Sequence, residues 1–313
     1  MKAPQRRAPP RRQVHGVLLL DKPKGLSSNA ALQHAKRLLN AAKAGHTGTL
    51  DPLATGLLPL CFGEATKFAQ LLLEADKTYA VTLRLGQVTT TGDAEGEVTL
   101  ERPVAVARAL FEAAIPQFVG RIAQCPPRHA ALKYEGRNYY EYAREGIEIP
   151  RAAREVVIHA VVVDSWSPPL VELTVQCGKG TYMRVLAEDL GEAIGCGAHV
   201  SALRRTATGG FGIAEAVTLD ALAALSDEER DRLLLPADAA CAALPRCDLA
   251  GAEAAGFREG QAVHRAELPD ATYRTYAAGV FAGVADAAQG LLRPRRLVAL
   301  AHGHIPSVES LES

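Results

Sequence analysis

The chain has 313 residues, which is long for a single hydrophobic core and predicts one large domain with a smaller companion. Its 35 basic and 35 acidic residues balance, so total charge gives no support for a nucleic-acid partner, and any such site must come from local clustering of charge. With 48% hydrophobic residues and no apolar run near the length that crosses a bilayer, we expect a soluble, cytoplasmic protein with no membrane partner.

The cysteines argue against a metal centre or a disulfide framework. They form no CxxC pair, and no histidine lies near them at the spacing of a zinc site. We therefore expect reduced thiols, several of them buried, and no structural metal. The six are Cys61, Cys125, Cys177, Cys196, Cys241 and Cys247.

Residues 1–15 are basic and rich in proline, and five of the first twelve are Lys or Arg. They lack the apolar core of a secretory signal, so we interpret them as a disordered arm. Such an arm can hold phosphates loosely, and a solvated tail without a role explains the composition equally well.

The stretch 16–23, which reads GVLLLDKP, predicts a buried strand that ends in a turn. Lys22 at this turn can bind phosphate, although a plain turn explains it as well. Ser28 and Asn29 then predict the start of a helix, and Gly45 lies just past the end of that helix.

Residues 45–56 read GHTGTLDPLATG, a glycine-punctuated and hydroxyl-rich loop between two apolar segments. The glycines permit tight turns or close approach of the backbone to a ligand. His46 and two threonines, Thr47 among them, supply hydrogen-bonding groups, and Asp51 is the only ionised side chain. A lone carboxylate in such a loop suits a nucleophile, although Asp51 followed by Pro52 is also typical of a helix start with the aspartate as N-cap.

Residues 77–86 alternate between apolar and polar side chains, which predicts a strand with Tyr79 on its inner face. A tyrosine in that position is usually a core residue whose hydroxyl has a hydrogen-bond partner. Periodicity alone favours this core interpretation of Tyr79.

The segment 121–150 combines basic and aromatic side chains, since five Lys or Arg and four Tyr fall within residues 121–144. Basic groups interleaved with aromatic rings can hold backbone phosphates and stack on unpaired bases. We therefore predict an RNA-gripping insertion here. The alternative is an amphipathic helix with a tyrosine-rich packed face.

Residues 156–166 and 170–177 predict two strands joined as a hairpin. The string GKGTYMR at 178–184 opens a helix, and it lacks the glycine and hydroxyl spacing of a nucleotide-binding P-loop. Arg184 lies early in this helix, where it either points into a site or is solvated.

Residues 199–206 predict a further strand with two arginines, and Ala-rich helices follow over 219–244. Beyond Cys247 the pattern changes to short strands with glycine-rich turns and a basic cluster. We therefore expect a small β-rich domain over residues 247–305 and a tail over residues 306–313.

Four separated motifs agree in order and spacing with one known family. They are residues 45–56 with the string GEATK at 63–67, KTY at 77–79, residues 126–133 with their tyrosine-rich sequel, and residues 178–184. Over roughly residues 16–211 the chain resembles TruB-type tRNA pseudouridine synthases, and the C-terminal region resembles a PUA domain. The resemblance implies an α+β fold, with a mixed, mainly antiparallel central sheet in a catalytic domain over 16–246 and a PUA-like β-domain after it.

The resemblance also implies a reaction, the isomerisation of uridine to pseudouridine at position 55 in the T-loop of tRNA. The N1 glycosidic bond breaks, the uracil turns while it is held, and C5 bonds to the same ribose carbon. Because bonds are only exchanged, no cofactor, nucleotide or metal is expected. The implied partner is the T-arm of tRNA without a guide RNA, and the protein is expected to be a monomer.

By carry-over from the family, Asp51 is the essential carboxylate, which either attacks the substrate covalently or abstracts a ribose proton. Both routes need Asp51 ionised, and Arg184 as its ion-pair partner would keep its pKa low in a desolvated pocket. Tyr79 would stack on the target base and take part in moving the C5 proton.

A set of substrate contacts follows from the same resemblance. His46 would fill the space that the flipped base leaves, and Leu203 would pack against that base. The expected binding residues are Lys22, His46, Thr47, Lys133, Tyr182 and Leu203.

Two functions of other classes stay open at the level of sequence. An RNA chaperone that binds and refolds tRNA would not need Asp51. A glycoside hydrolase would need a second carboxylate poised as an acid, for which Glu64 is the nearby candidate.

Overall fold

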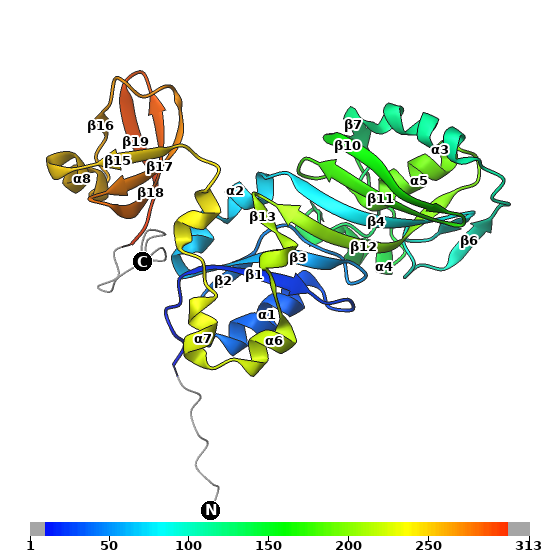
Figure 1. Cartoon of the computed structure of the whole chain (residues 1–313), viewed down its shortest axis with the longest axis horizontal. Helices are drawn as coiled ribbons and strands as arrows, with labels where there is room; N and C mark the ends of the chain where they lie inside the picture. Colours follow the sequence, from blue (N-terminus) through cyan, green and yellow to red (C-terminus); the bar gives the residue numbers. More distant parts are fainter. Residues whose placement is uncertain (1–9, 300–313) are drawn as a thin grey trace, which may run out of the picture.

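The computed structural model describes residues 10–299, and these form two units (Figure 1). The larger unit is a long mixed sheet with helices packed on it, and the smaller one is a β-rich domain at the C-terminal end of the chain. This architecture confirms the expected α+β class with a mixed, mainly antiparallel central sheet. Residues 1–9 and 300–313, which include the expected tail, lie outside the described residues.

The helices are short, and strands carry most of both units. The α-helices are α1 (Ser28–Leu38), α2 (Ala69–Glu74), α3 (Arg108–Ala114), α4 (Tyr139–Arg144), α5 (Met183–Ala193), α6 (Leu219–Ala224), α7 (Asp227–Arg232) and α8 (Gly251–Arg258). The 3-10 helices are η1 (Gly63–Lys67), η2 (Ile115–Phe118), η3 (Ile213–Glu215) and η4 (Ala237–Cys241). The strands of the larger unit are β1 (Gly16–Lys22), β2 (Ala44–His46), β3 (Thr55–Phe62), β4 (Lys77–Leu85), β5 (Gln87–Thr89), β6 (Val98–Glu101), β7 (Gly120–Gln124), β8 (Lys133–Tyr134), β9 (Arg137–Asn138), β10 (Arg154–Ser167), β11 (Leu170–Cys177), β12 (Ala198–Thr208), β13 (Phe211–Gly212) and β14 (Val217–Thr218). Those of the smaller unit are β15 (Arg246–Leu249), β16 (Val263–His264), β17 (Ala271–Ala277), β18 (Val280–Ala288) and β19 (Leu291–Leu297).

The main path of the central sheet runs β14, β1, β3, β12, β4, β11, β10, β7. β1 pairs with β14 and β3 pairs with β12 in parallel, and the other neighbours along this path are antiparallel. Within the described residues, the backbones of β3 and β12 pair at two positions, Thr55 with Arg204 and Gly56 with Arg205. The sheet therefore consists of two halves that meet at these two pairs, which we call the seam.

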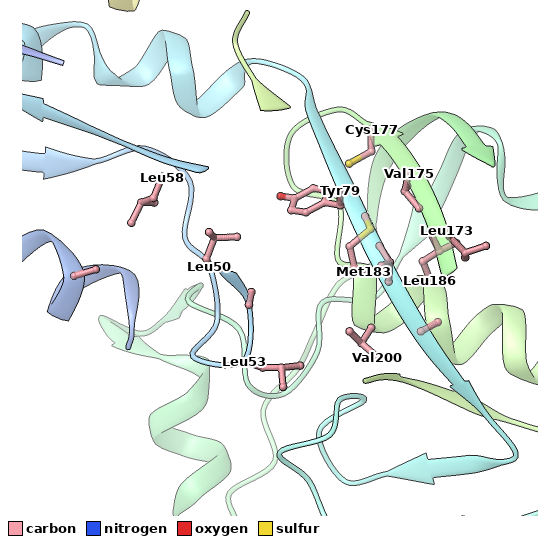
Figure 2. Close-up of a cluster of buried hydrophobic side chains, with 14 of the residues drawn as sticks. Leu50, Leu53, Leu58, Tyr79, Leu173, Val175, Cys177, Met183, Leu186 and Val200 are labelled. Atoms are coloured by element: carbon pink, nitrogen blue, oxygen red, sulfur yellow. The ribbon is translucent and has the colours of Figure 1, made fainter. Parts of the chain in front are cut away.

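Apolar side chains of β4, β11 and β12 form the main core together with α5. Along β4 the buried residues alternate, as expected for a strand with one face inward. Met183 and Leu186 of α5 pack in one cluster with Leu173 of β11 (Figure 2). Each buried leucine contributes about 2 kcal/mol by leaving water. Tyr79 projects from β4 toward the loop that carries Leu50 (Figure 2), so the core continues into that loop.

The C-terminal domain docks on the larger unit through apolar side chains. Its strands pair in the order β15, β17, β18, β19, β16, and α8 packs on this sheet. Tyr276 and Phe281 of this domain share a buried cluster with Phe68 and Leu72 of the larger unit. The ring centres of Phe68 and Phe281 lie 5.3 Å apart in an edge-on arrangement. These contacts fix the place of the domain relative to the sheet.

The expectation of a disordered arm over residues 1–15 is wrong for residues 10–15, which pack against the larger unit. Val14 is 6% exposed, and Arg12 forms an ion pair with Asp231 in the last turn of α7. Val14 leaves water, and Arg12 gains a charged partner on the folded surface. Both effects hold this stretch in place.

None of the helices between residues 10 and 299 is long and apolar enough to cross a membrane. The six cysteines all lie in this part of the chain and are free thiols, and of these Cys125 is exposed.

Candidate active site

The loop that carries Asp51, here called the Asp51 loop (residues 47–54), joins β2 to β3 and is anchored by a side chain from α1. The Ser28 hydroxyl donates to the Leu50 carbonyl at 3.0 Å and accepts the Leu50 N–H at 2.7 Å. These bonds hold the backbone directly before Asp51. The loop contains no helix, so the alternative of a helix that starts at Asp51 is wrong.

Two glycines of the motif leave room for an arginine of β12. Gly48 and Gly56 have φ angles of +78° and +100°, a backbone region that favours glycine. A Cβ atom at Gly56 would lie 2.3 Å from the backbone oxygen of Arg205, and one at Gly48 would lie 3.0 Å from its guanidinium. Close packing at the seam thus explains why glycine stands at both positions.

Asp51 and Arg184 form an ion pair that links the two halves of the sheet. Arg184 lies in the first turn of α5, and its Nη2 is 3.0 Å from Oδ2 of Asp51. The side chain of Arg184 is 6% exposed and that of Asp51 is 37% exposed, so the carboxylate is the more accessible partner of the pair. The expected ion pair is confirmed, and the alternative of a solvated Arg184 is wrong.

Asp93 is a second carboxylate on the same arginine. Its Oδ2 lies 3.7 Å from Nη1 of Arg184. Its Oδ1 accepts the Thr91 hydroxyl at 2.6 Å and the Glu95 N–H at 3.1 Å. Arg184 also donates to the backbone carbonyls of Thr91 and His129, at 3.3 and 3.1 Å. The guanidinium is therefore held in one orientation by acceptors on several sides.

The pKa of Asp51 lies above the ordinary value of an aspartate. Burial raises it, Arg184 lowers it, and the negative charge of Asp93 raises it. This corrects the expectation of a low pKa, because the desolvation of the carboxylate outweighs the stabilisation from its ion pair. A poorly solvated carboxylate is a stronger base and nucleophile than one in water.

Asp51 lines a cavity of about 570 Å³, which is within the usual size range of ligand pockets. The Asp51 loop with the start of α1, the polar segment after β5, and the insertion between β7 and β10 enclose it. Its polar lining includes Asn29, His46, Asp93, His129, Tyr140 and Arg144. The cavity can therefore present one reactive carboxylate to a ligand held by hydrogen bonds and an aromatic ring.

The insertion supplies groups that the sequence marked only as a cluster. The Asn138 amide donates to the Tyr140 hydroxyl at 3.1 Å, and the guanidinium carbon of Arg144 lies 5.3 Å from the centre of the Tyr140 ring. The interleaving of basic and aromatic residues over 121–144 is the signal that could find them. Asp93 had no such signal, because its segment reads as a polar loop.

His46 directly precedes the Asp51 loop in the chain, and Tyr79 projects toward this loop from β4 (Figure 2). His46 lines the cavity, and its Nδ1 is buried with no hydrogen-bond partner among the described residues. Burial and the charge of Arg205 lower the pKa of His46, which favours the neutral ring. Tyr79 is 8% exposed, burial raises the pKa of its hydroxyl, and Arg205 lowers it.

Lys22 and Thr47 are not part of the cavity lining. The Thr47 hydroxyl donates to the Pro59 carbonyl at 3.1 Å. Lys22 is fully buried, and its ammonium group donates to the carbonyls of Pro23 and Leu26 at 2.9 and 2.6 Å. Burial lowers the pKa of Lys22 to about 8. The structure does not place these two side chains where they can touch a substrate, because the backbone takes up their hydrogen bonds.

The other expected contacts are spread around the site. Tyr182 precedes α5, and its backbone N–H and carbonyl bond to the side-chain amide of Gln124 at 2.9 and 3.3 Å. Leu203 lines a neighbouring cavity of about 370 Å³ together with Leu53. Lys133 of β8 is exposed on the insertion. The structure therefore places these three near the site but outside the lining of the Asp51 cavity.

Glu64 lies at the contact with the C-terminal domain. Its carboxylate pairs with Lys67 at 2.7 Å and accepts the N–H of Ala299 at 2.6 Å. Lys67 in turn donates to the Leu297 carbonyl at 2.9 Å. Glu64 therefore does not serve as the second acid that a glycoside hydrolase needs beside Asp51. Among residues 10–299, no group of three or more His, Cys, Asp or Glu side chains is arranged to hold a metal ion.

Family models match the chain along most of its length. Residues 36–183 match "TruB family pseudouridylate synthase (N terminal domain)". Residues 184–242 match "tRNA pseudouridylate synthase B C-terminal domain", and residues 245–298 match "Pseudouridine synthase II TruB, C-terminal".

Individual proteins show the same likeness. The chain is 56% identical over 306 residues to tRNA pseudouridine synthase B of Cupriavidus pinatubonensis, with 93% of this chain and 96% of that protein covered. It is 57% identical over 302 residues to the protein of the same name from Ralstonia nicotianae, again with 93% and 96% covered. A chain in the crystal structure of a Cbf5-Nop10-Gar1 complex superposes with a TM-score of 0.68 at 27% identity, with 87% of this chain and 78% of that chain covered.

Proposed function

The chain belongs to the TruB family of pseudouridylate synthases, and we propose that it converts uridine to pseudouridine at position 55 in the T-loop of tRNA. The pairing of Asp51 with Arg184 at a cavity of about 570 Å³ is the observation that carries the proposal. The names of the relatives, tRNA pseudouridine synthase B, support tRNA as the substrate.

The reaction exchanges one bond of the uracil for another. The bond between N1 and C1′ of the ribose breaks, a bond between C5 and C1′ forms, the proton on C5 is lost, and N1 gains a proton. Asp51 either attacks the substrate covalently or removes a ribose proton, and both routes start from its ionised form. The burial that raises the pKa of Asp51 makes the anion more reactive, while Arg184 holds its position.

The target base must leave its stack to reach Asp51, because the carboxylate lies inside a cavity. His46 at the cavity wall would occupy the space that the flipped base leaves. Tyr79 projects from β4 toward the Asp51 loop (Figure 2), and from there its ring would stack on the base and its hydroxyl would help to move the C5 proton.

The insertion would close over the RNA. Its basic and aromatic groups, Tyr140 and Arg144 at the cavity and Lys133 on the outer side, suit contacts with phosphates and unpaired bases. We propose that the protein binds the T-arm by itself, as a cytoplasmic monomer without a guide RNA. The Cbf5 structure, by contrast, is of a complex that also contains Nop10 and Gar1.

The test is position-mapped conversion of uridine to pseudouridine in an unmodified tRNA transcript, with the native protein, Asp51→Asn and the control Asp220→Asn. Asp220 is an exposed acid in α6, so its replacement makes the same chemical change away from the cavity. We expect the native protein and the control to modify the T-loop, and Asp51→Asn to lose at least about 10³-fold in rate while it still binds tRNA.

A different pattern would overturn the proposal. If the native protein binds and refolds tRNA without converting uridine, the protein acts as an RNA chaperone. If uridines outside the T-loop are converted, the enzyme assignment stands and the proposed target is wrong.

A further inference from the structure

Arg205 of β12 is the largest fully buried side chain among the described residues. Its partners are backbone carbonyls rather than a carboxylate. The Nε group donates to the Leu57 carbonyl at 2.6 Å, and Nη2 donates to the Gly48 carbonyl at 3.1 Å. Burying a charged guanidinium is costly unless its donors are satisfied, so a side chain that only filled this space would be apolar. The charge at this position therefore calls for a function.

The two carbonyls that Arg205 binds lie on either side of Asp51 in the chain. Gly48 is in the Asp51 loop before the carboxylate, and Leu57 is in β3 after it. One rigid guanidinium thus ties together the two ends of the segment that presents Asp51. A lysine has the same charge but lacks the planar fork that reaches both carbonyls.

Arg205 also lies beside Tyr79. The two residues are directly paired between β12 and β4, so their side chains share one face of the sheet. Burial raises the pKa of the Tyr79 hydroxyl, and the charge of Arg205 lowers that pKa. The same guanidinium therefore binds the backbone on both sides of Asp51 and lies on the same face of the sheet as the side chain of Tyr79.

We infer that Arg205 is a positioning residue for the isomerisation, which fixes the Asp51 loop and Tyr79 in one mutual arrangement without touching the substrate. This inference rests on the proposed function. Its place in the fold supports it, because Arg205 is one of the two β12 residues at the seam, where the half of the sheet with Asp51 meets the half with Tyr79.

The test compares Arg205→Lys and Arg205→Met with a matched control, Arg230→Lys. Arg230 is also an arginine with low exposure that donates to backbone carbonyls, those of Leu38, Leu222 and Ala223, but it lies in α7. The measurements are kcat and KM on an unmodified tRNA transcript, and amide hydrogen exchange of residues 47–57 in the protein without RNA.

For Arg205→Lys we expect kcat to fall about 10²-fold with KM within about threefold of the native value, since misplacement of a reacting group by about 1 Å has an effect of this size. Exchange in residues 47–57 should become faster. Arg230→Lys should lower the melting temperature and leave kcat and this exchange unchanged. Arg205→Met is expected to be the more severe variant, and Arg205→Lys decides the matter if Arg205→Met does not fold.

The link to Tyr79 is tested by single-turnover rates of Arg205→Lys in a Tyr79→Phe background. In that background Arg205→Lys should lower the single-turnover rate by a smaller factor than in the native background, because the hydroxyl that Arg205 acts on is already absent.

Three results would overturn the inference: a kcat of Arg205→Lys within twofold of native, unchanged exchange in residues 47–57, or an equal cost of the lysine substitution in both backgrounds. Failure of the proposed function is recognised separately, because the native protein would then show no conversion while hydrogen exchange still reports on the loop.

Discussion

Asp51 and Glu64 are two carboxylates from neighbouring stretches of the same motif, and the structure gives them opposite surroundings. Asp51 lines a cavity, is held by one arginine and has a second carboxylate nearby, and its pKa is raised. Glu64 lies between the two units. Burial alone raises the pKa of Glu64, but Lys67 and the N–H of Ala299 together lower it below its ordinary value.

The difference shows that partners decide what a carboxylate does. Glu64 gains enough from Lys67 and Ala299 to become a stable, unreactive anion that fastens the C-terminal domain. At Asp51 the ion pair with Arg184 offsets only part of the cost of burying the charge, so this negative charge is available to a ligand. Hydrogen bonding and burial, rather than residue type, therefore decide whether a carboxylate is reactive or supports the structure.

The strongest way to break the comparison is to remove the cation from Asp51. In Arg184→Met, Asp51 and Asp93 lose their shared partner, so the pKa of Asp51 should rise and its orientation should loosen. We expect kcat to fall about 10³-fold and the acid limb of the pH–rate profile to move to higher pH. Tight binding of tRNA should weaken as well, and single-turnover rates with equilibrium binding measure the two effects.

The control for that prediction is Arg184→Lys, which keeps the charge and loses the fork. We expect its rate to lie between those of the native protein and Arg184→Met. A rate for Arg184→Met within tenfold of native would contradict the role of the ion pair.

A milder change sharpens the comparison by altering only the second carboxylate. Asp93 raises the pKa of Asp51, so Asp93→Asn should lower that pKa and move the acid limb of the pH–rate profile to lower pH. We expect kcat above this limb to fall about tenfold, because Arg184 loses one of the two negative charges that hold it in place. Rates measured over a pH series test this prediction. An acid limb that stays in place or moves to higher pH would show that Asp93 does not raise the pKa of Asp51.

The smallest effect on activity is expected at Glu64. In Glu64→Gln, kcat should stay within about twofold of native, while the free energy of unfolding falls by about 1 kcal/mol through loss of the ion pair and of the charged acceptor for Ala299. Denaturant titration and steady-state rates measure the two quantities.

The pH dependence of this loss follows from the sign of the shift. The folded pKa of Glu64 is lowered, so its stabilisation is complete above the pKa of an unfolded glutamate and disappears as the pH falls through the folded pKa. The native protein and Glu64→Gln should therefore converge in stability in acid. A difference that persists there would show that the charge of Glu64 is not the source of the stabilisation.

Much of the fold and the central pair of the site could be predicted from the sequence. Alternation along β4, the hairpin of β10 and β11, and the helix that opens near Arg184 all depend on local periodicity, which the sequence carries directly. The pairing of Asp51 with Arg184 came from the resemblance of separated motifs and is confirmed by their distance.

The rest depended on tertiary contacts that no local pattern records. Arg204 and Arg205 are neighbours of the same residue type, but successive side chains of a strand point to opposite faces. Arg204 therefore forms a half-exposed ion pair with Asp21, whereas Arg205 is fully buried. Thr47 reads as a ligand group, yet the neighbouring strand takes its hydroxyl. Asp93 lies far from Asp51 in the sequence, and only the path of the segment after β5 brings them together.

The seam of the sheet also leaves no room for a larger side chain on β3. At Gly56 the first added carbon would meet the backbone of Arg205, which no exchange of side chain on β12 can move away. A larger residue at Gly56 would therefore push β3 and β12 apart where they pair, and the Asp51 loop would shift relative to Tyr79 on β4.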